Sequence, residues 1–239
     1  MAPGALGSPA VVADPVLLIT GASTGIGAAT ARHAAGAGYR VALGARSEEK
    51  LNAITAELGG VQRAIAVRCD VTELADLQTL AQRTLEAFGQ IDAVFANAGF
   101  GGPRGFEAGS PEDWRAMVLT NVLGCAYTIR ATLPALRESR GHAVLTSSVA
   151  GRRPLKGSLY SVTKHAVTAM GEALRQDVDG SGIRVTLIEP GMVDTPFFDE
   201  KPTDALHADD IAEAVMFALT RPAHVDVNEI LVRPTAQSG

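Results

Sequence analysis

The sequence is poor in the residues that cross-link a chain or bind a metal ion. It has two cysteines among its 239 residues, Cys69 and Cys125, which lie far apart and have no ligand-like spacing to a histidine. Disulfide frameworks and zinc sites need several such residues at short, regular spacings. We therefore expect two buried, reduced thiols, no metal site and a reducing, cytoplasmic compartment.

An excess of positive charge and long apolar runs are also lacking. The formal net charge is -5, and no cluster of lysines or arginines provides the basic surface that a nucleic-acid backbone requires. Residues 1–14 lack the basic and apolar segments of a signal peptide, and no later apolar run approaches the ~18–20 residues that cross a bilayer. Nucleic acid and membrane are therefore not expected as partners.

From Pro15 onward, short β-branched runs alternate with longer segments in which apolar residues recur at helical spacing. This order is typical of βαβ units around a parallel sheet with helices on both faces. The sequence predicts a flexible tail at 1–14 and one α/β domain at 15–239, a doubly wound, Rossmann-type, seven-stranded parallel sheet. The expected strands are Val16–Thr20, Arg40–Ala45, Arg63–Cys69, Asp92–Ala96, His142–Ser147, Ile183–Glu189 and Glu229–Val232. The expected helices are Ile26–Ala37, Glu48–Leu58, Leu74–Phe88, Glu112–Ala135, Leu159–Val178 and Asp209–Thr220, and the glycines expected to close helices in a left-handed conformation are Gly59, Gly89, Gly141 and Gly182.

A glycine-rich turn joins the first expected strand to the first helix. It reads Thr20-Gly21-Ala22-Ser23-Thr24-Gly25-Ile26-Gly27, and side chains at its glycines would obstruct a pyrophosphate that approaches the amides of a helix N-terminus. The spacing differs from G-x-G-x-x-G, and an ordinary glycine-rich turn is the alternative. The strand-turn-helix context favours dinucleotide binding, with contacts from Gly21, Ser23, Thr24, Gly25, Ile26 and Gly27.

The residues after the second expected strand indicate which dinucleotide is bound. A site that recognises a free 2′-hydroxyl places an acid here, whereas this chain reads Ala45-Arg46-Ser47. Arg46 would form a charge-assisted bond to a 2′-phosphate with help from Ser47, which favours NADP(H) over NAD(H); a solvated loop arginine is the alternative. Asp70 would accept a hydrogen bond from the adenine amino group or cap the next helix, and the neighbouring Val71 is expected to contact the cofactor.

Tyr160 and Lys164 are four residues apart and would share one face of a helix. A tyrosine has an unperturbed pKa of ~10, and we expect the neighbouring ammonium to lower the pKa of Tyr160 toward the working pH. Tyr160 would then give a proton to a forming alkoxide or accept one from an alcohol. Taken alone, the pair would more often be a lysine packed beside a half-buried ring.

Five motifs in order along the chain carry a resemblance to a known family. They are the glycine turn, Asn97-Ala98-Gly99, Ser147-Ser148, the Tyr160 and Lys164 pair, and Pro190-Gly191. With them the chain resembles the short-chain dehydrogenase/reductase (SDR) family from Val16 to Gln237. The resemblance implies an oxidoreductase that transfers hydride between NADP(H) and a carbonyl or secondary alcohol of a small substrate. A non-catalytic, NADP-binding sensor of the same fold is the alternative.

The resemblance also assigns roles to single residues. The family's catalytic serine falls on Ser148, although its spacing to Tyr160 is one residue shorter than usual and leaves Ser147 open. Lys164 would also hold the nicotinamide ribose, and Asn121 would support a water-linked proton relay or else be a polar core residue that kinks its helix. Further cofactor contacts would come from Asn97, Ala98, Gly99, Pro190, Gly191, Val193 and Thr195.

The substrate end of the chain is less informative. The segment Phe197–Leu206 would form a short lid, within about 192–208, and Arg152 or Arg153 would bind a substrate carboxylate or be solvated. The tail from Arg221 to Thr235 resembles the subgroup of NADP-dependent β-hydroxy acid and serine dehydrogenases, which implies a small hydroxy or keto substrate. Family members commonly form tetramers through two long helices and the last strand, so we expect a homo-oligomer, tetramer or dimer.

Overall fold

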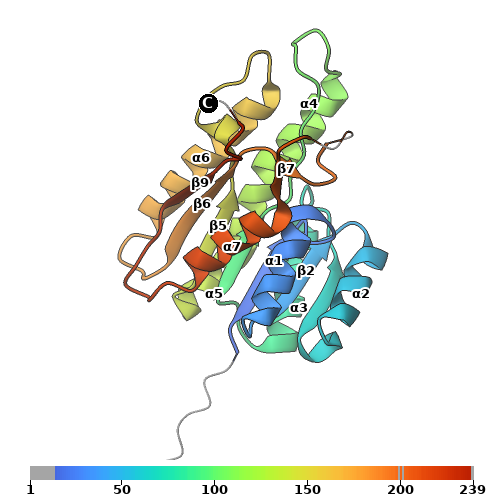
Figure 1. The fold of residues 1–239 in the computed structure, drawn as a ribbon. Coiled ribbons are helices and arrows are strands. Elements are labelled where there is room, and N and C mark those ends of the chain that lie inside the picture. The colour runs from blue at the N-terminus through green and yellow to red at the C-terminus, as the bar shows by residue number, and fades with distance from the viewer. Residues whose placement is uncertain (1–13, 199, 201, 238–239) are drawn as a thin grey trace, which may run out of the picture.

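In a computed structural model of the chain, the structure describes residues 14–198, 200 and 202–237. These residues form a seven-stranded, wholly parallel sheet in the order β3-β2-β1-β4-β5-β6-β9 (Figure 1). The predicted doubly wound sheet is confirmed, and most strand ends lie within a residue or two of the expected ones. The strands are β1 (Val16–Thr20), β2 (Arg40–Ala45), β3 (Ala64–Arg68), β4 (Ala93–Ala96), β5 (His142–Thr146), β6 (Arg184–Pro190) and β9 (Glu229–Val232).

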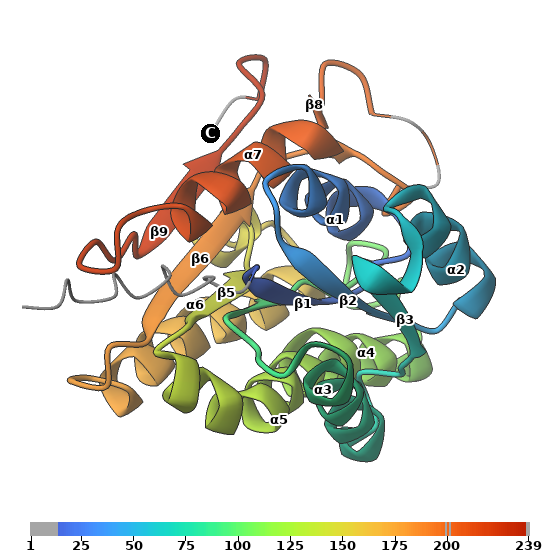
Figure 2. The same cartoon turned by 90° about the horizontal axis from the view of Figure 1, so that it is seen from below.

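Helices cover both faces of the sheet, which explains why its strands are apolar on both sides. Helices α1 (Gly25–Gly36), α2 (Glu48–Glu57) and α7 (Ala208–Leu219) pack on one face, and α3 (Leu74–Phe88), α5 (Gly124–Ser139) and α6 (Leu159–Asp177) on the other (Figure 2). Each face has its own aliphatic cluster, and the cluster under α3, α5 and α6 includes Cys69 and Cys125 as buried thiols.

The long helix before β5 extends beyond the predicted Glu112–Ala135 and contains a π-helical turn that was not predicted. It runs as α4 (Pro111–Val118), a π-helical turn η2 (Leu119–Leu123) and α5. This stretch has 29 residues and contains an 18-residue window with a mean hydropathy of 1.2. By length and composition alone it could cross a membrane, contrary to the expectation that no apolar run approaches that length. Helix α5 packs against α3 and β4, and 39% of the apolar window is buried.

Local backbone details correct one further expectation and add short elements. Gly59, Gly89 and Gly182 have the expected positive φ, but before β5 the left-handed residue is Arg140, with φ 51°, and not Gly141. Gly141 is needed for space, because a Cβ there would lie 2.4 Å from the carbonyl oxygen of Asp92. Short elements that the sequence did not predict are η1 (Gly60–Gln62), η3 (Val149–Gly151), β7 (Val193–Asp194) and β8 (Leu206–His207), the last two paired in a small second sheet.

The predicted tail lies outside the described residues except for its last member. Asp14 is described, and its carboxylate accepts a hydrogen bond of 2.9 Å from Arg63 Nη1. Its carbonyl oxygen accepts another from Arg40 Nη2 at 3.1 Å. These two bonds attach Asp14, which the prediction had placed in the tail, to Arg63 and to Arg40 at the start of β2.

His142 begins β5 as a buried, neutral side chain. The Thr186 hydroxyl donates to the carbonyl oxygen of Val227 at 2.5 Å, so Nε2 of His142 must donate to that hydroxyl across 2.7 Å. This tautomer leaves Nδ1 as a bare acceptor, which has no hydrogen-bond partner among the described residues. Burial, with a smaller contribution from the Arg184 guanidinium, lowers the pKa of His142 to about 3.

Folding should therefore weaken in mild acid. The unfolded histidine titrates near a pKa of ~6.5 and the folded one near 3, so the stabilisation present above pH ~6.5 is lost as the pH falls toward 3. Between pH 7 and 5 the free energy of unfolding should fall by about 2 kcal/mol from this residue. Urea unfolding at the two pH values should show this loss in the wild type and in the exposed control His224→Gln, but not in His142→Gln. An equal loss in His142→Gln would contradict the assignment.

Candidate active site

The predicted site residues gather at the carboxyl ends of the central strands. The glycine turn follows β1, Asn97 follows β4, Ser148 follows β5 and Gly191 follows β6. Strand β1 lies between β2 and β4, so that the chain leaves β1 and β4 in opposite directions. In a doubly wound sheet, this switch point opens the crevice in which ligands bind.

The turn after β1 has the shape of a phosphate cradle. Gly21 and Gly25 have φ of 66° and 54°, values that favour glycine. A Cβ on Gly27 would lie 2.4 Å from Gly21 O, and one on Gly25 would lie 3.2 Å from Thr195 Cβ. The turn therefore accommodates only glycine at these places and brings Thr195, predicted to contact the nicotinamide, against the phosphate turn.

The backbone amides at the N-terminus of α1 can bind an anion. Its N-cap residue Thr24 makes no side-chain capping bond within the described part of the chain, and its first turn contains no acidic residue. The first N–H groups of a helix lack intrahelical acceptors, and the helix dipole favours negative charge there. These residues therefore fit a dinucleotide pyrophosphate, with Ser23, Thr24 and Ile26 in the turn as predicted.

Asn97 fixes the glycine turn to its neighbours. Its amide N–H donates to Thr20 Oγ1 at 3.1 Å, and its Nδ2 donates to Thr20 O at 3.2 Å. Its Oδ1 accepts from Thr146 Oγ1 at 3.3 Å. Ala98 lies against Gly21, where a Cβ would be 2.8 Å from Ala98 Cα. Asn97-Ala98-Gly99 thus holds the ends of β1, β4 and β5 together beside the cradle.

The end of β2 carries the cation expected near an adenosine ribose. Arg46 is exposed, and Ser47 is the N-cap of α2. Asp70 closes a turn by accepting from the Thr72 amide at 3.0 Å and its hydroxyl at 2.8 Å, and these bonds, together with Arg46 and Arg68, lower the pKa of Asp70. The N-cap of α3 is Glu73, so Asp70 orders the approach to the helix without capping it.

The structure adds one residue to this region, Arg68, and places another, Val71, in the core. Arg68 was not predicted to lie near the cofactor. It is the exposed last residue of β3 and carries a charge in an otherwise apolar strand. The sequence alone could therefore have indicated it. Val71, grouped with the cofactor residues, is buried. A Cβ on Gly124 would lie 2.7 Å from Val71 Cγ2, so the Val71 side chain packs against the start of α5.

Tyr160, Ser148 and Lys164 meet where α6 begins. A hydrogen bond joins the side chains of Ser148 and Tyr160. The Lys164 ammonium lies 5.7 Å from the centroid of the Tyr160 ring and donates to Thr146 O at 2.7 Å. The i,i+4 spacing therefore brings the phenol and the ammonium onto one face of the helix, as predicted.

Burial determines how Tyr160 and Lys164 titrate. Burial raises the pKa of Tyr160 to about 12, and the hydrogen bond with Ser148 offsets this only in part. Burial also lowers the pKa of Lys164 to about 8. The expected lowering of the pKa of Tyr160 by the ammonium is therefore wrong for this geometry, because the loss of solvation outweighs an ammonium that is bonded to a strand carbonyl.

The structure distinguishes the two adjacent serines. Ser148 Oγ accepts from Ala150 N at 3.1 Å and donates to Pro190 O at 3.2 Å, on the side of Tyr160. Ser147 Oγ is buried and donates to Lys164 O at 3.1 Å. The spacing to Tyr160 left both serines as candidates. The hydroxyl that lies beside the phenol is that of Ser148.

Asn121 lies in the π-helical turn η2, buried beneath the site. Its Nδ2 donates to Phe100 O at 2.9 Å and to Thr163 Oγ1 at 3.1 Å, and its Oδ1 accepts from Phe100 N at 3.0 Å. These bonds fit the polar core residue that was the alternative, and the water-linked relay stays a prediction. It also lies near the ammonium, since a Cβ on Gly99 would be 3.1 Å from Asn121 Oδ1 and 3.6 Å from Lys164 Nζ.

The turn after β6 is covered by the end of the chain. Gln237 Oε1 accepts from Met192 N at 3.0 Å, and a Cβ on Gly191 would collide with that oxygen at 2.2 Å. Val193 is buried and begins β7. Gln237 was not predicted to take part, because no local pattern connects it to a turn 45 residues earlier.

Aromatic side chains from the predicted lid lie over the phenol. The Phe197 ring packs edge-on against Tyr160, with centroids 5.4 Å apart, and against Phe198 at 5.0 Å. Residues 199 and 201 of the lid lie outside the described part. Arg152 and Arg153, the candidates for a substrate carboxylate, are both exposed, and Arg152 is already paired with Glu189 and Glu229.

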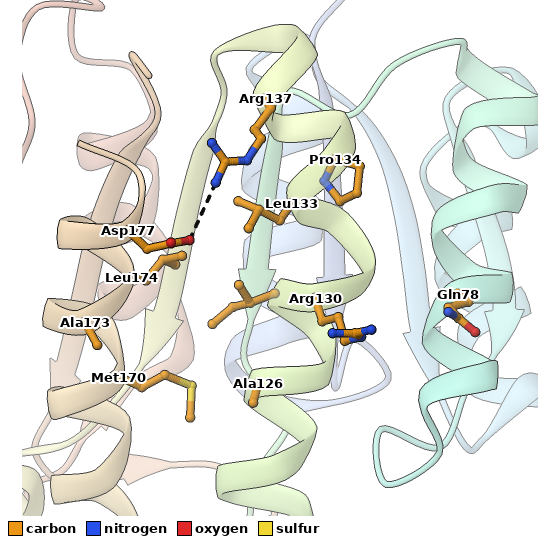
Figure 3. A pocket seen from close by; sticks show the side chains of 11 residues that line it. Gln78, Ala126, Arg130, Leu133, Pro134, Arg137, Met170, Ala173, Leu174 and Asp177 are labelled. Carbon is orange, nitrogen blue, oxygen red and sulfur yellow. Dashed lines mark ion pairs between the residues drawn. The ribbon is translucent and has the colours of Figure 1, made fainter. Parts of the chain in front are cut away.

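A hollow lies away from these groups. It is a groove of about 780 Å³ between α5 and α6, and Figure 3 shows apolar side chains of the two helices facing each other across it. Arg137 and Asp177 form an ion pair of 3.6 Å at one end. Ala126, Ile129, Leu133, Met170 and Ala173 line it. None of the predicted catalytic or cofactor residues lines this groove.

The geometry at the sheet end supports proton transfer beside a bound dinucleotide. A cradle for phosphates, a neutral phenol, a hydroxyl bonded to it and a buried ammonium lie along one edge of the sheet. Such groups can orient an oxygen atom and exchange a proton with it. This arrangement matches what the sequence resemblance implies for an oxidoreductase.

Comparisons with known proteins agree on the family. A protein-family model with the description short chain dehydrogenase matches residues 15–206 of this chain. An uncharacterized oxidoreductase of Staphylococcus saprophyticus is 40% identical over 228 residues, which cover 92% of this chain and 97% of the relative. Homologues of this kind therefore support the oxidoreductase class.

Solved structures share the whole fold. An alcohol dehydrogenase from the archaeon Thermococcus sibiricus, complexed with 5-hydroxy-NADP, has 34% identity and a TM-score of 0.86, covering 94% of this chain and 98% of its own. A closed form of serine dehydrogenase complexed with NADP+ has 32% identity and a TM-score of 0.86, covering 94% and 96%. A 3-ketoacyl-(acyl-carrier-protein) reductase from Brucella melitensis, complexed with NADH, has 27% identity and a TM-score of 0.84, covering 92% and 97%. With its five ordered motifs, parallel sheet and matching family model, the chain belongs to the short chain dehydrogenase family of oxidoreductases.

Proposed function

We propose that the protein is an NADP(H)-dependent oxidoreductase that interconverts a carbonyl and a secondary alcohol of a small substrate. The observation that carries the proposal is the contact of the Tyr160 phenol with Ser148 and its proximity to the buried Lys164 ammonium, at the same sheet edge as the glycine cradle. A bound NADP(H) would supply or accept the hydride. The proton chemistry belongs to the residues of this chain.

Each residue of the group has a distinct task. Ser148 binds the substrate oxygen through its hydroxyl, and Tyr160, neutral below its pKa of about 12, donates the proton to that oxygen in reduction. Lys164 places a cation near the phenol, which favours the phenolate that forms as the proton leaves. The edge-on ring of Phe197 shields this exchange from water. Oxidation of an alcohol uses the same groups in reverse.

The choice of NADP(H) rests on cations at the ribose end. Arg46 follows β2 where an acid would be needed for a free 2′-hydroxyl, and Arg68 lies close enough to act on Asp70 together with Arg46. Two guanidinium groups match a 2′-phosphate in charge and hydrogen-bonding geometry. The NADP-bound alcohol and serine dehydrogenases support this preference, and the serine dehydrogenase supports a small hydroxy or keto substrate.

Replacing the phenol tests catalysis directly. Tyr160→Phe should lower kcat about 10²- to 10⁴-fold, the usual contribution of a general acid, because the ring remains but its proton does not. NADPH binding, followed by fluorescence, should persist. Assays with a panel of aldehydes, ketones and β-hydroxy acids, with Tyr39→Phe as a control at the other end of the sheet, would measure this. Tight NADPH binding with no turnover of any substrate by the wild type would instead indicate the cofactor sensor.

Replacing Arg46 tests the cofactor preference. Arg46→Ala should raise the KM for NADPH about 10- to 100-fold, as expected for one lost charge-assisted hydrogen bond, and leave the KM for NADH nearly unchanged. Lys50→Ala removes an exposed cation of α2 and should change neither value. A wild type that prefers NADH, or an Arg46→Ala variant that keeps its preference, would show that Arg46 has no such role.

We also propose that the protein forms a homo-oligomer in the cytoplasm. The apolar groove between α5 and α6 is bordered by Arg137 and Asp177, so the charges of one copy can meet opposite charges of a second copy related by a twofold axis. The exposed strand β9 at the sheet edge offers a second contact and thus a route from dimer to tetramer.

A charge in the groove should break this assembly. Leu133→Glu would bury a carboxylate between two copies, so sedimentation should show a smaller species than the wild type forms. Val61→Glu, at an exposed position far from the groove, should keep the wild-type mass. A wild type that sediments as a monomer, or a Leu133→Glu variant of unchanged mass, would refute the interface.

A further inference from the structure

Arg152 links three segments that meet beside Ser148. Its Nε donates to Glu189 Oε1 at 2.7 Å, and its Nη2 is ion-paired with Glu229. Arg152 ends the turn η3 that begins just after Ser148, Glu189 belongs to β6, and Glu229 begins β9. One guanidinium therefore connects the loop that follows Ser148, residues 149–152 (the serine loop), to the two neighbouring strands β6 and β9.

The ion pair of Arg152 with Glu189 and a hydrogen bond of the Ser148 hydroxyl join the same two segments. Ser148 Oγ donates to Pro190 O at 3.2 Å, and Glu189 directly precedes Pro190 in the chain. The same two segments are therefore bridged twice, once through the hydroxyl and once through the ion pair. The Ser148 hydroxyl also accepts from Ala150 N at 3.1 Å inside η3. A movement of η3 away from β6 would break the ion pair and displace the hydroxyl together.

Glu189 makes this link sensitive to charge. Only 1% of its side chain is exposed, and burial raises the pKa of Glu189 while the Arg152 guanidinium lowers it. A buried carboxylate that loses its cation is strongly disfavoured in its charged form. Glu189 would then take up a proton or draw away from its present position, and Pro190 is the next residue.

The charges around Glu189 come from several elements. Among the described residues, those that act on it are Arg152 of the serine loop and Glu229 of β9, which raises its pKa further. Helices α6 and α7 also pack on β6. On α6, the Lys164 ammonium is bonded to Thr146 O. Of the other charged groups on these two helices, Glu213 is exposed. Glu172 is paired with Arg175, Asp177 with Arg137, Asp209 with His33, and Asp210 with the His207 amide.

We propose that Arg152 is a positioning residue, which neutralises the buried Glu189 and thereby holds the Ser148 hydroxyl in place for the substrate oxygen. The proposal rests on the proposed function, in which Ser148 binds that oxygen. It replaces the expectation that Arg152 binds a substrate carboxylate, since two carboxylates of the chain already occupy its guanidinium.

Removing the guanidinium should create a new pH dependence. In Arg152→Ala at pH 8, kcat should fall about 10- to 100-fold, the cost of a misplaced catalytic group, with little change in the KM for NADPH. As the pH is lowered, Glu189 without its cation takes up a proton, so kcat should recover toward the wild-type value at the same pH. The added Glu189→Gln substitution, which is neutral at every pH, should remove this pH dependence and restore most of kcat at pH 8.

Two further variants complete the test. Arg152→Lys keeps a cation and should retain more kcat than Arg152→Ala, which keeps the question answerable if the alanine variant unfolds. Lys156→Ala removes an exposed cation from the same loop and should behave as the wild type. A purely structural role for Arg152 would lower the melting temperature in Arg152→Ala but leave the pH profile of kcat unchanged, and that result would overturn the proposal.

Crystal structures separate this proposal from the proposed function. The Ser148 Oγ atom should be displaced from Pro190 O in Arg152→Ala and return in Arg152→Ala/Glu189→Gln, whether or not the protein reduces a carbonyl. An unmoved Ser148 in the single variant, or a low kcat that the double variant fails to rescue at any pH, would refute the positioning role. Absence of turnover in the wild type would refute only the catalytic function.

Discussion

The bond from the buried Lys164 ammonium to the Thr146 carbonyl connects the two halves of the site. The carbonyl belongs to β5, and the hydroxyl of the same threonine donates to Asn97, which in turn holds Thr20 at the start of the glycine turn. A continuous path of hydrogen bonds therefore joins helix α6 to the glycine turn. Because each member is held by strands of a covered parallel sheet, the distance between cradle and phenol is set by the core.

The core also explains the unusual protonation of the site. The aliphatic packing that holds α6 against the sheet removes water from both the phenol and the ammonium, so the pKa of Tyr160 is raised and that of Lys164 is lowered. The sequence led to the opposite expectation for Tyr160, because four-residue spacing reveals that two groups are neighbours but not how far each is buried. A neutral phenol at physiological pH suits the donation of a proton in carbonyl reduction.

Most of the fold, and the gathering of the candidate site residues at one edge of the sheet, could be predicted from local patterns. Apolar strands such as β1, helical periodicity and the ordered motifs were sufficient for the seven-stranded sheet. The features that were missed depend on contacts between distant segments: Gln237 on the turn after β6, the ion pairs of Arg152 with β6 and β9, and the left-handed Arg140 before a crowded Gly141. Sequence spacing cannot show such contacts, because tertiary packing decides them.

The most direct test of the account is to follow the hydrogen that reaches the substrate carbon. NADPH deuterated at one face of the nicotinamide C4 should be used to reduce a ketone that the wild type accepts, with the product analysed by mass spectrometry and NMR. The account predicts that one of the two faces transfers a single deuterium to the carbinol carbon, while the oxygen takes its proton from solvent by way of the phenol. A carbinol carbon that remains unlabelled with both labelled cofactors would contradict it.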